Sequence, residues 1–469
     1  MKMWAGRFRQ PLDPQFEQWQ RSFSFDRRLL QYELAASAAH AQALKNAGIL
    51  SAEELINILH GLQQIGERAA ASASFLEDED AEDVHHFVEK QLVALIGEVG
   101  YKLHSGRSRN EQIATDLRLY VRASIDQLRQ ELADLCAVFT DRAEQAGDAA
   151  MPAYTHLQRA EPVLVAHWLL AFVEMLLRDA DRLADCRKRL NLCPLGSGAV
   201  AGATHALDRK SMADTLGFDG PTGNSIDATS DRDFAIEFVN ALSTLALHLS
   251  RWAEEMILFS SQEYGFVQLP EPYSTGSSAM PQKKNPDLLE LVRGKCSRVL
   301  GDATALMVTV KGLPLAYNKD LQETQEPVFH AADTVLQMLP LTIGFMRSVE
   351  FNHERMQQVA GSGLMNAWAA ATYLVNRGVP SRLAHECTGK AVKLCAEKGC
   401  ELEDLPLPEL QSLNPAFGQD FYEALKLKSV LAIHDVTGGT APGRVRQAIC
   451  LARERVESLR EEVHAHANA

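Results

Sequence analysis

Three long stretches of this 469-residue chain contain neither glycine nor proline, and they limit the possible folds more than any other feature. They cover residues 111–146, 163–193 and 224–264. Glycine and proline are the residues that most often break a helix, so each stretch can form one continuous helix. At 1.5 Å per residue the first would reach about 50 Å, which few globular helices do. No clear β-strand run lies between them, and we predict an all-α fold built on a long-helix bundle.

The third stretch has apolar side chains around most of the helix circumference. A helix of this kind is buried deep inside a bundle or between subunits. A monomer would leave large apolar faces of such helices in water, so we expect an oligomer of identical chains. The apolar residues are Phe234, Ile236, Phe238, Val239, Leu242, Leu245, Leu247, Leu249, Trp252, Met256, Ile257 and Phe259.

The regions on either side of the long stretches have shorter helices. Glycines interrupt the chain before residue 110, and prolines become frequent beyond about residue 361. We therefore predict three helical domains: an N-terminal domain over residues 1–110, the central bundle over 111–360, and a small C-terminal domain over 361–469.

Charge and composition exclude some classes of partner. Hydrophobic residues make up 46% and charged residues 23% of the chain, as in ordinary soluble proteins. The formal net charge of −14 and the lack of a basic run argue against nucleic acid as a partner. Any site for an anion must therefore be built locally from selected lysines and arginines.

The cysteines and the apolar segments predict a cytoplasmic protein with no membrane partner. None of the eight cysteines forms a C-x-x-C pair, which favours free thiols in a reducing compartment. The first residues lack the apolar core of a signal peptide. The most apolar run, Val163 to Leu177, contains His167 and Glu174 and is too short to span a bilayer.

A polar loop over residues 274–287 combines small residues with two adjacent lysines, Lys283 and Lys284. It also contains the hydroxyl group of Ser277 and the amide of Asn285. Hydroxyls on a mobile loop beside concentrated positive charge suit proton transfer near an anionic substrate. An ordinary polar loop can have the same composition, so composition alone leaves both interpretations open.

A second polar loop, residues 103–112, places two arginines, two serines and an asparagine at the start of the first long helix. Helix N-termini offer free N–H groups, and arginine binds carboxylates with two hydrogen bonds. We predict an anion-binding loop with Arg107, Ser108 and Asn110 as candidate binding residues. A plain helix cap is the alternative.

A third loop lies between two prolines, over residues 151–162, and contains Thr155, His156 and Gln158. A lone histidine is usually structural. A Thr-His pair followed by glutamine and arginine in a constrained loop is as compatible with catalysis, so both interpretations stay open.

Metal and cofactor motifs are missing from the sequence. The acidic segment 75–87 ends in His85 and His86, which would point about 100° apart on a helix, and the chain has no H-E-x-x-H motif. We interpret this segment as an acidic helix start, from which His85 can still face a site. The glycine-rich segment 194–203 fits neither common nucleotide-binding pattern. We expect acid–base chemistry by side chains, with no metal and no cofactor.

The signature loop, defined here as residues 276–286, resembles that of the fumarase/aspartase superfamily, whose members eliminate fumarate from succinyl compounds. Other segments resemble the argininosuccinate lyase and delta-crystallin branch of that superfamily, and the resemblance covers essentially the whole chain. Those segments are residues 4–8, 106–110, 154–159, 230–233 and 315–320.

The resemblance implies three helical domains, a central bundle that joins four subunits, and active sites shared between three of them. It also implies cleavage of argininosuccinate to arginine and fumarate, the last step of arginine synthesis, without a cofactor. Ser277 would handle the proton on carbon, with His156 as the other candidate for proton transfer, and which is base and which is acid stays open. Lys283 would stabilise the carboxylate of the carbanion-like intermediate.

Further residues match positions that contact substrate in this family: Ser22, Asn110, Thr155, Asn285, Tyr317 and Gln322. Gln325 differs, because many members have lysine there, and a neutral amide keeps hydrogen-bond donors but loses the charge. Smaller departures are Ala5, Ser105, Glu111 and Ala153. Two alternatives follow: a related lyase for another N-substituted aspartate, or a structural protein of the crystallin kind. Retention of Ser277, Lys283, Thr155 and His156 argues against the second.

Overall fold

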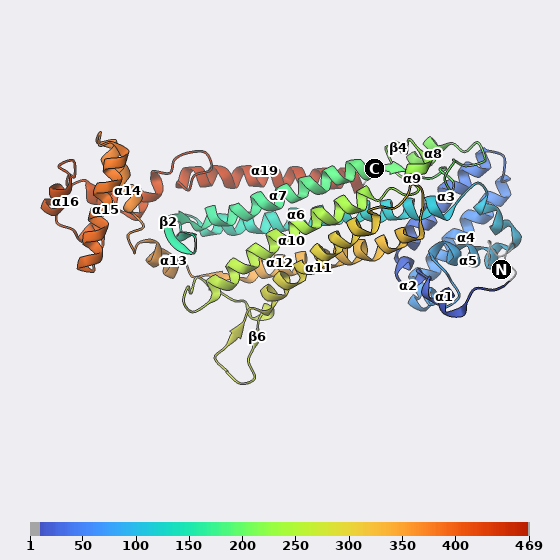
Figure 1. Cartoon of the computed structure of the whole chain (residues 1–469), viewed down its shortest axis with the longest axis horizontal. Helices are drawn as coiled ribbons and strands as arrows, with labels where there is room; N and C mark the ends of the chain where they lie inside the picture. Colours follow the sequence, from blue (N-terminus) through green and yellow to red (C-terminus); the bar gives the residue numbers. More distant parts are fainter. Residues whose placement is uncertain (1–9, 468–469) are drawn as a thin grey trace.

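The computed structural model describes residues 10–467 and confirms the all-α fold class. Long helices run side by side along the long axis of the molecule (Figure 1). They form the predicted bundle, while the segment 4–8 and Ala5 lie outside the described residues. The bundle helices are α6 (Arg109–Ala146), α7 (Val165–Leu190), α10 (Asp233–Ser260), α11 (Asp287–Val310) and α12 (Gln325–Ser348).

The first two predicted helices agree with α6 and α7, but the third is wrong at its start. Residues 224–264 form a short helix, α9 (Ser225–Ala228), and then the long helix α10. Asp231 Oδ1 accepts a hydrogen bond from the backbone N–H of Asp233 (2.8 Å), while the Ser230 hydroxyl donates to the carbonyl of Ile226 (3.3 Å). Such side-chain bonds to the backbone compete with a continuous helix, which explains the break without glycine or proline.

Shorter helices gather at one end of the bundle (Figure 1). The start of α4 has a capping box, in which Ser51 Oγ accepts from the N–H of Glu54 and Glu54 Oε2 accepts from the N–H of Ser51 (3.1 and 2.9 Å). The hydrophobic core continues from these helices into the bundle without a gap. The shorter helices at this end are α1 (Pro14–Trp19), α2 (Phe23–Asp26), α3 (Leu30–Asn46), α4 (Ala52–Ala71) and α5 (Val84–Ile96).

The opposite end of the bundle carries a small helical unit with a core of its own around Phe417 and Phe421. The last helix, α19 (Pro442–Ala467), leaves this unit and returns along the bundle beside α6 and α7 (Figure 1). The division into 1–110, 111–360 and 361–469 stays a prediction, and we propose that α19 belongs to the bundle. The unit comprises α14 (Ala367–Asn376), α15 (Ser381–Lys398), α16 (Leu407–Leu413), α17 (Phe421–Ala424) and α18 (Leu427–Ala432), and α13 (His353–Ala360) leads into it.

Short strands occur in two-stranded pairs within the described residues. The segment 151–162, which we predicted to be a constrained loop, is a β-hairpin. Its strands are β1 (Ala150–Thr155) and β2 (Gln158–Leu164), which pair antiparallel. The other pairs are β3 (Leu192–Cys193) with β4 (Gly220–Pro221), β5 (Val267–Gln268) with β8 (Glu350–Phe351), and β6 (Thr275–Gly276) with β7 (Lys284–Asn285). A short helix, α8 (Arg209–Thr215), precedes β4.

One segment, Lys319–Ser348, is long and apolar enough to cross a membrane by length and composition. Of the 18-residue apolar stretch within this segment, 61% is buried inside the structure, because the segment includes α12 of the bundle. Burial of this kind is what a core helix of a helical bundle shows.

The buried face of α10 generates a stability prediction. Phe238 is fully buried, so Phe238→Ala should lower the free energy of unfolding by about 3–5 kcal/mol through lost burial and the cavity left behind. The exposed Ile56 on α4 provides the control, because Ile56→Ala should change stability by less than about 0.5 kcal/mol. Urea unfolding of both variants measures the difference, and equal midpoints would contradict the placement of Phe238 in the core.

Candidate active site

The β1–β2 hairpin presents the predicted catalytic residues Thr155 and His156 at its exposed tip. Thr155 pairs with Gln158, so His156 and Leu157 are the two residues of the turn, and both have a φ of +56°. Positive φ at both central positions is typical of a type I′ turn, which usually uses glycine or asparagine. Left-handed backbone at ordinary side chains is concentrated at functional sites, which supports a functional role for this turn.

The base of this hairpin is held rigidly although its tip is exposed. The backbone N–H of Leu164 donates to Thr440 Oγ1 (2.8 Å), next to the start of α19. The ring of Tyr154 lies against the rings of Phe259 and Tyr264, at centroid distances of 6.1 and 5.5 Å. These contacts anchor the two strands that carry the turn with His156.

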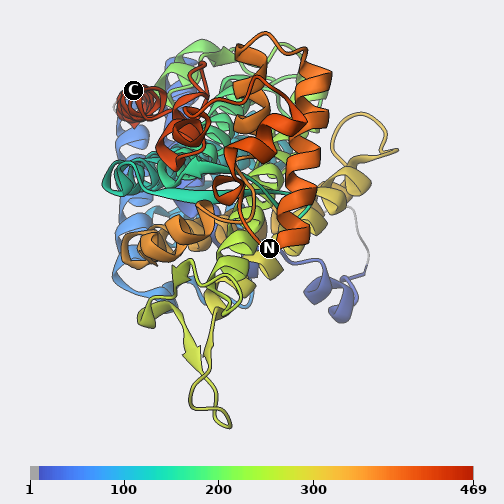
Figure 2. The same cartoon turned by 90° about the vertical axis from the view of Figure 1, so that its left-hand side faces the viewer.

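The signature loop projects away from the bundle between β6 and β7 (Figures 1 and 2). Ser277 Oγ accepts hydrogen bonds from the backbone N–H groups of Ala279 (3.3 Å) and Met280 (3.1 Å). The N–H of Lys283 donates to the carbonyl of Met280 and closes the loop (3.0 Å). Two N–H donors aimed at one hydroxyl oxygen favour negative charge on it, which is what a serine base requires.

The structure separates the two adjacent lysines of the loop. Lys284 Nζ donates to the carbonyl of Leu269 (2.6 Å), so this ammonium group fixes the base of the loop. Lys283 is exposed beyond the strand pair. The Asn285 amide donates to the carbonyl of Gly276 across the base (3.4 Å). Lys283 therefore stays the lysine that we predict to bind a ligand.

The base of the signature loop also docks on the bundle through Tyr273. This side chain fills a notch at Gly344 in α12, where an added Cβ would overlap the Tyr273 hydroxyl and lie 2.9 Å from its ring carbon Cζ. The ring of Phe345 lies 6.2 Å from that of Tyr273. Neither Tyr273 nor Gly344 had a signal in the sequence, because the contact joins distant segments.

The predicted anion-binding loop forms the N-terminus of α6. Ser108 caps the helix, accepting from the N–H of Asn110 (3.3 Å), and its own N–H donates to Glu111 Oε1 (3.3 Å). The glycine-rich segment packs on this end: Glu111 Oε2 accepts from the N–H of Gly198 (2.7 Å), and the Asn110 amide donates to the carbonyl of Ala199 (3.3 Å). Of the three predicted residues, Ser108 and Asn110 are partly exposed at the helix start.

Arg107 occupies a different place from its two neighbours. Its side chain is 4% exposed, and its guanidinium Nη1 lies 3.7 Å from Glu33 and donates to Ser37 Oγ (2.8 Å). It therefore points into the N-terminal helices, and a direct contact with substrate stays a prediction.

The remaining predicted residues lie near the same end of the bundle. Ser22 is buried and its hydroxyl donates to Asp26 Oδ2 (2.6 Å). The Gln322 amide donates to the carbonyl of Gln20 (3.2 Å). Gln325 is buried at the start of α12. Burial raises the pKa of Tyr317, while the charge of Arg232 acts in the opposite direction.

Glu82 joins three of these segments and was not anticipated from the sequence. Its carbonyl accepts from the N–H of Ser22 (2.9 Å). Its carboxylate lies 3.4 Å from Arg109 and 3.9 Å from Lys319. The segments that carry Ser22, Asn110 and Tyr317 therefore meet at one acidic residue, from the segment that we predicted to be a helix start.

The predicted site residues fall into separate groups within one chain. Asn110 lies at the first turn of α6, and the hairpin with Thr155 follows the last turn. The 38 residues of α6 span about 57 Å, so one chain cannot bring these residues together. The signature loop forms a third group at the side of the bundle (Figure 1).

Comparison with known proteins agrees with this architecture. A lyase family model matches residues 6–301, and an argininosuccinate lyase C-terminal model matches residues 364–432. The solved EDDS lyase in complex with formate superposes with a TM-score of 0.82 at 27% identity, covering 98% of this chain and 93% of that one. A class II fumarase from Schistosoma mansoni has a TM-score of 0.73 at 17% identity, covering 85% of this chain and 90% of that one.

The fold and these loops define a carbon–nitrogen lyase of the fumarase/aspartase superfamily. Among curated relatives, argininosuccinate lyase from Koribacter versatilis is 61% identical over 467 residues and 100% of both chains. That of Acidobacterium capsulatum is 57% identical, covering 98% of this chain and 96% of the relative. The chain belongs to the argininosuccinate lyase family.

The Tyr273 notch generates a prediction. Gly344→Ala should lower both the thermal midpoint and kcat, because the added methyl group displaces Tyr273 and with it the base of the signature loop. Helix propensity alone would instead stabilise the helix by about 1 kcal/mol. Gly389→Ala in α15 is the matched control, since a Cβ there meets nothing within 4 Å. A Gly344→Ala variant that is as stable and active as the control would contradict the docking.

Proposed function

We propose that the chain cleaves argininosuccinate into arginine and fumarate, and that Ser277, Lys283, Thr155 and His156 carry the reaction. Identity of 61% along the whole length of a curated argininosuccinate lyase carries the substrate assignment. The hydrogen bonds to Ser277 Oγ support the assignment of the chemistry.

The reaction is an elimination. A base removes a proton from the carbon beside a carboxylate, the C–N bond breaks, and its electron pair leaves on the guanidino nitrogen, which takes up a proton. Negative charge grows on the carboxylate next to the deprotonated carbon, where the ammonium group of Lys283 would stabilise it. Ser277 and His156 are the two proton-transfer groups, and Thr155 lies beside His156. No step in this scheme requires a cofactor or metal.

We further propose the substrate contacts. The loop at the start of α6 (residues 103–112, called the α6 loop from here on) supplies Arg107, Ser108 and Asn110. The hairpin supplies Gln158, and the signature loop supplies Asn285. The N-terminal end of the bundle supplies Ser22, Tyr317, Gln322 and Gln325. Gln325 brings an amide to a position where the family often has lysine. A related lyase for another N-substituted aspartate is therefore the alternative, and an EDDS lyase superposes on this chain with a TM-score of 0.82.

The proposed active unit is a homotetramer with sites shared between subunits. The length of α6 between Asn110 and Thr155 supports sharing, because the two groups must come from different chains. Apolar side chains left exposed on α10, α11 and α12 support the assembly, since such faces are covered by partners. They include Leu247, Leu291, Leu300, Met307, Val308 and Leu341.

We propose a cytoplasmic location, with a small-molecule substrate and neither nucleic acid nor membrane as partner. All eight cysteines are free thiols, consistent with a reducing compartment. The apolar Lys319–Ser348 segment is mostly buried in the bundle.

The first test is fumarate release from argininosuccinate, followed by absorbance. Ser277→Ala should lower kcat by about 10²–10⁴-fold, the usual contribution of a proton-transfer group, while light scattering still shows the tetramer. Lack of fumarate at high wild-type concentration would refute the substrate. Near-normal turnover by the variant would refute the role of Ser277.

Shared sites generate a mixing prediction. Asn110→Ala and Thr155→Ala should each be inactive as pure proteins, but co-expression should restore activity, because some hybrid sites combine the intact residue of each chain. Random assembly of equal amounts gives about a quarter of the wild-type activity. Hybrids without activity, despite confirmed mixing by mass spectrometry, would show that both residues come from one chain.

A further inference from the structure

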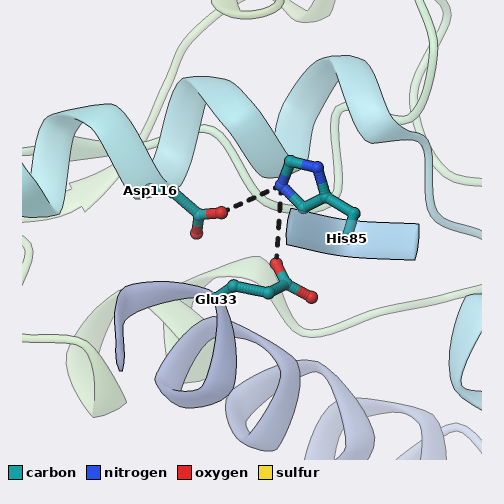
Figure 3. Close-up of side chains that lie close together, drawn as sticks. All are labelled: Glu33, His85 and Asp116. Carbon is teal, nitrogen blue, oxygen red and sulfur yellow. Dashed lines mark hydrogen bonds and ion pairs between the residues drawn. The ribbon is translucent and has the colours of Figure 1, made fainter. Parts of the chain in front are cut away.

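A buried cluster of charged side chains lies beneath the segments that carry Ser22 and Asn110. At its centre is His85 of α5, between Asp116 of α6 and Glu33 of α3 (Figure 3). His85 Nε2 is 3.0 Å from Asp116 Oδ2 and 3.8 Å from Glu33 Oε2. All three side chains are buried, so their charges must balance locally.

Charge balance decides the state of His85. The guanidinium group of Arg107 lies 3.7 Å from Glu33. With Asp116 ionised, a neutral His85 would leave two carboxylates against one cation, whereas an imidazolium gives two charges of each sign. Burial and the charge of Glu33 raise the pKa of Asp116 to about 7, so this count applies above that pH. A divalent metal with a neutral His85 would instead leave Arg107 in excess, so the balance favours a proton over a metal.

The surroundings of His85 agree with this balance. Burial opposes the imidazolium, but the hydrogen bond to Asp116 and the charges of Glu33 and Asp83 outweigh it and raise the pKa of His85 to about 9. Arg109 compensates Asp83 at 3.1 Å. Asp26 and His104 also act on His85 electrostatically.

Short hydrogen bonds connect the cluster to the candidate substrate residues. Asp26 accepts from the N–H of Val84, next to His85, and from the Ser22 hydroxyl (3.0 and 2.6 Å). On the other side, the Ser37 hydroxyl donates to Glu33 Oε1 (2.6 Å) and accepts from Arg107 (2.8 Å).

The start of α6 is tied to Glu33 a second time. The amide of Gln112 donates to Glu33 Oε1 (3.0 Å). Glu33 therefore holds the loop through Arg107, which precedes Ser108 and Asn110, and holds the helix through Gln112. A change in the charge of the cluster would displace both substrate-facing segments together.

We propose that Glu33, His85 and Asp116 are positioning residues, and that an imidazolium at His85 holds Ser22 and the α6 loop in the geometry that binds substrate. The proposal rests on the proposed function for its kinetic readout. It assigns no direct contact with substrate to these three side chains.

The test is charge compensation. His85→Gln removes one positive charge and should raise KM by about tenfold and lower the thermal midpoint, with a much smaller change in kcat. Adding Asp116→Asn restores neutrality, so the double variant should have a lower KM and a higher midpoint than His85→Gln alone. His60→Gln is the control, because that histidine is exposed on α4.

The pH dependence gives a second readout. Because the pKa of His85 is raised, its stabilising charge is complete below the unfolded value of about 6.5 and is lost as pH rises through about 9. The thermal midpoint of the wild type should therefore fall as pH rises from about 6.5 to 9, and its KM should rise as pH passes about 9. The double variant His85→Gln/Asp116→Asn should lack that component, although titration of the substrate affects both proteins equally.

Two outcomes would overturn the proposal. One is a His85→Gln variant with unchanged KM and midpoint, and the other is a double variant no better than His85→Gln in either measurement. If His85→Gln does not fold, the proposal requires the double variant to fold. The thermal midpoints test the network even if argininosuccinate is not cleaved, so this failure is distinguishable from failure of the proposed function.

Discussion

The length of α6 is the constraint on which the rest of the structure depends. A continuous helix of 38 residues holds its ends about 57 Å apart and cannot bend enough to bring them together. The loop with Asn110 precedes it, and the hairpin with Thr155 and His156 follows it. A site that uses both ends must be built from more than one chain, and the apolar residues exposed on α10 to α12 are the faces that we propose for that assembly. The same rigidity keeps each group in a fixed position on its own subunit.

Much of the fold could be predicted because its signals are local. The range 111–146 agrees with α6 to within two residues, since a stretch without glycine or proline needs no distant contact to stay helical. The break before α10 was missed because it arises from side-chain bonds of Ser230 and Asp231 to the backbone. The hairpin was missed because its turn uses histidine and leucine at positive φ, where the usual pattern has asparagine and glycine.

The candidate site could be predicted only in part, because residue types do not reveal partners. Lys283 and Lys284 are adjacent residues of the same type, so the sequence cannot assign them different roles. The hydrogen bond from Lys284 to the carbonyl of Leu269 distinguishes them. Arg107 was grouped with Ser108 and Asn110 as an anion-binding residue, yet its partner is Glu33, from a distant part of the chain. His85 was seen as a residue that could face a site, but Asp116 lies 31 positions away and sequence spacing gives no hint of the contact.

The signature loop and the buried cluster beneath the α6 loop have opposite electrostatic properties. At the signature loop, positive charge and N–H donors are exposed and have few fixed partners, so they keep their capacity to stabilise charge that forms during the reaction. Beneath the α6 loop, the charges of Glu33, His85, Asp116 and Arg107 are buried and compensate one another, which makes the geometry stiff. In our proposal an acidic protein binds a tricarboxylate in this way: Glu33, Glu82 and Asp83 compensate the charges of Arg107 and Arg109, and Lys283 meets the negative charge that develops on the substrate.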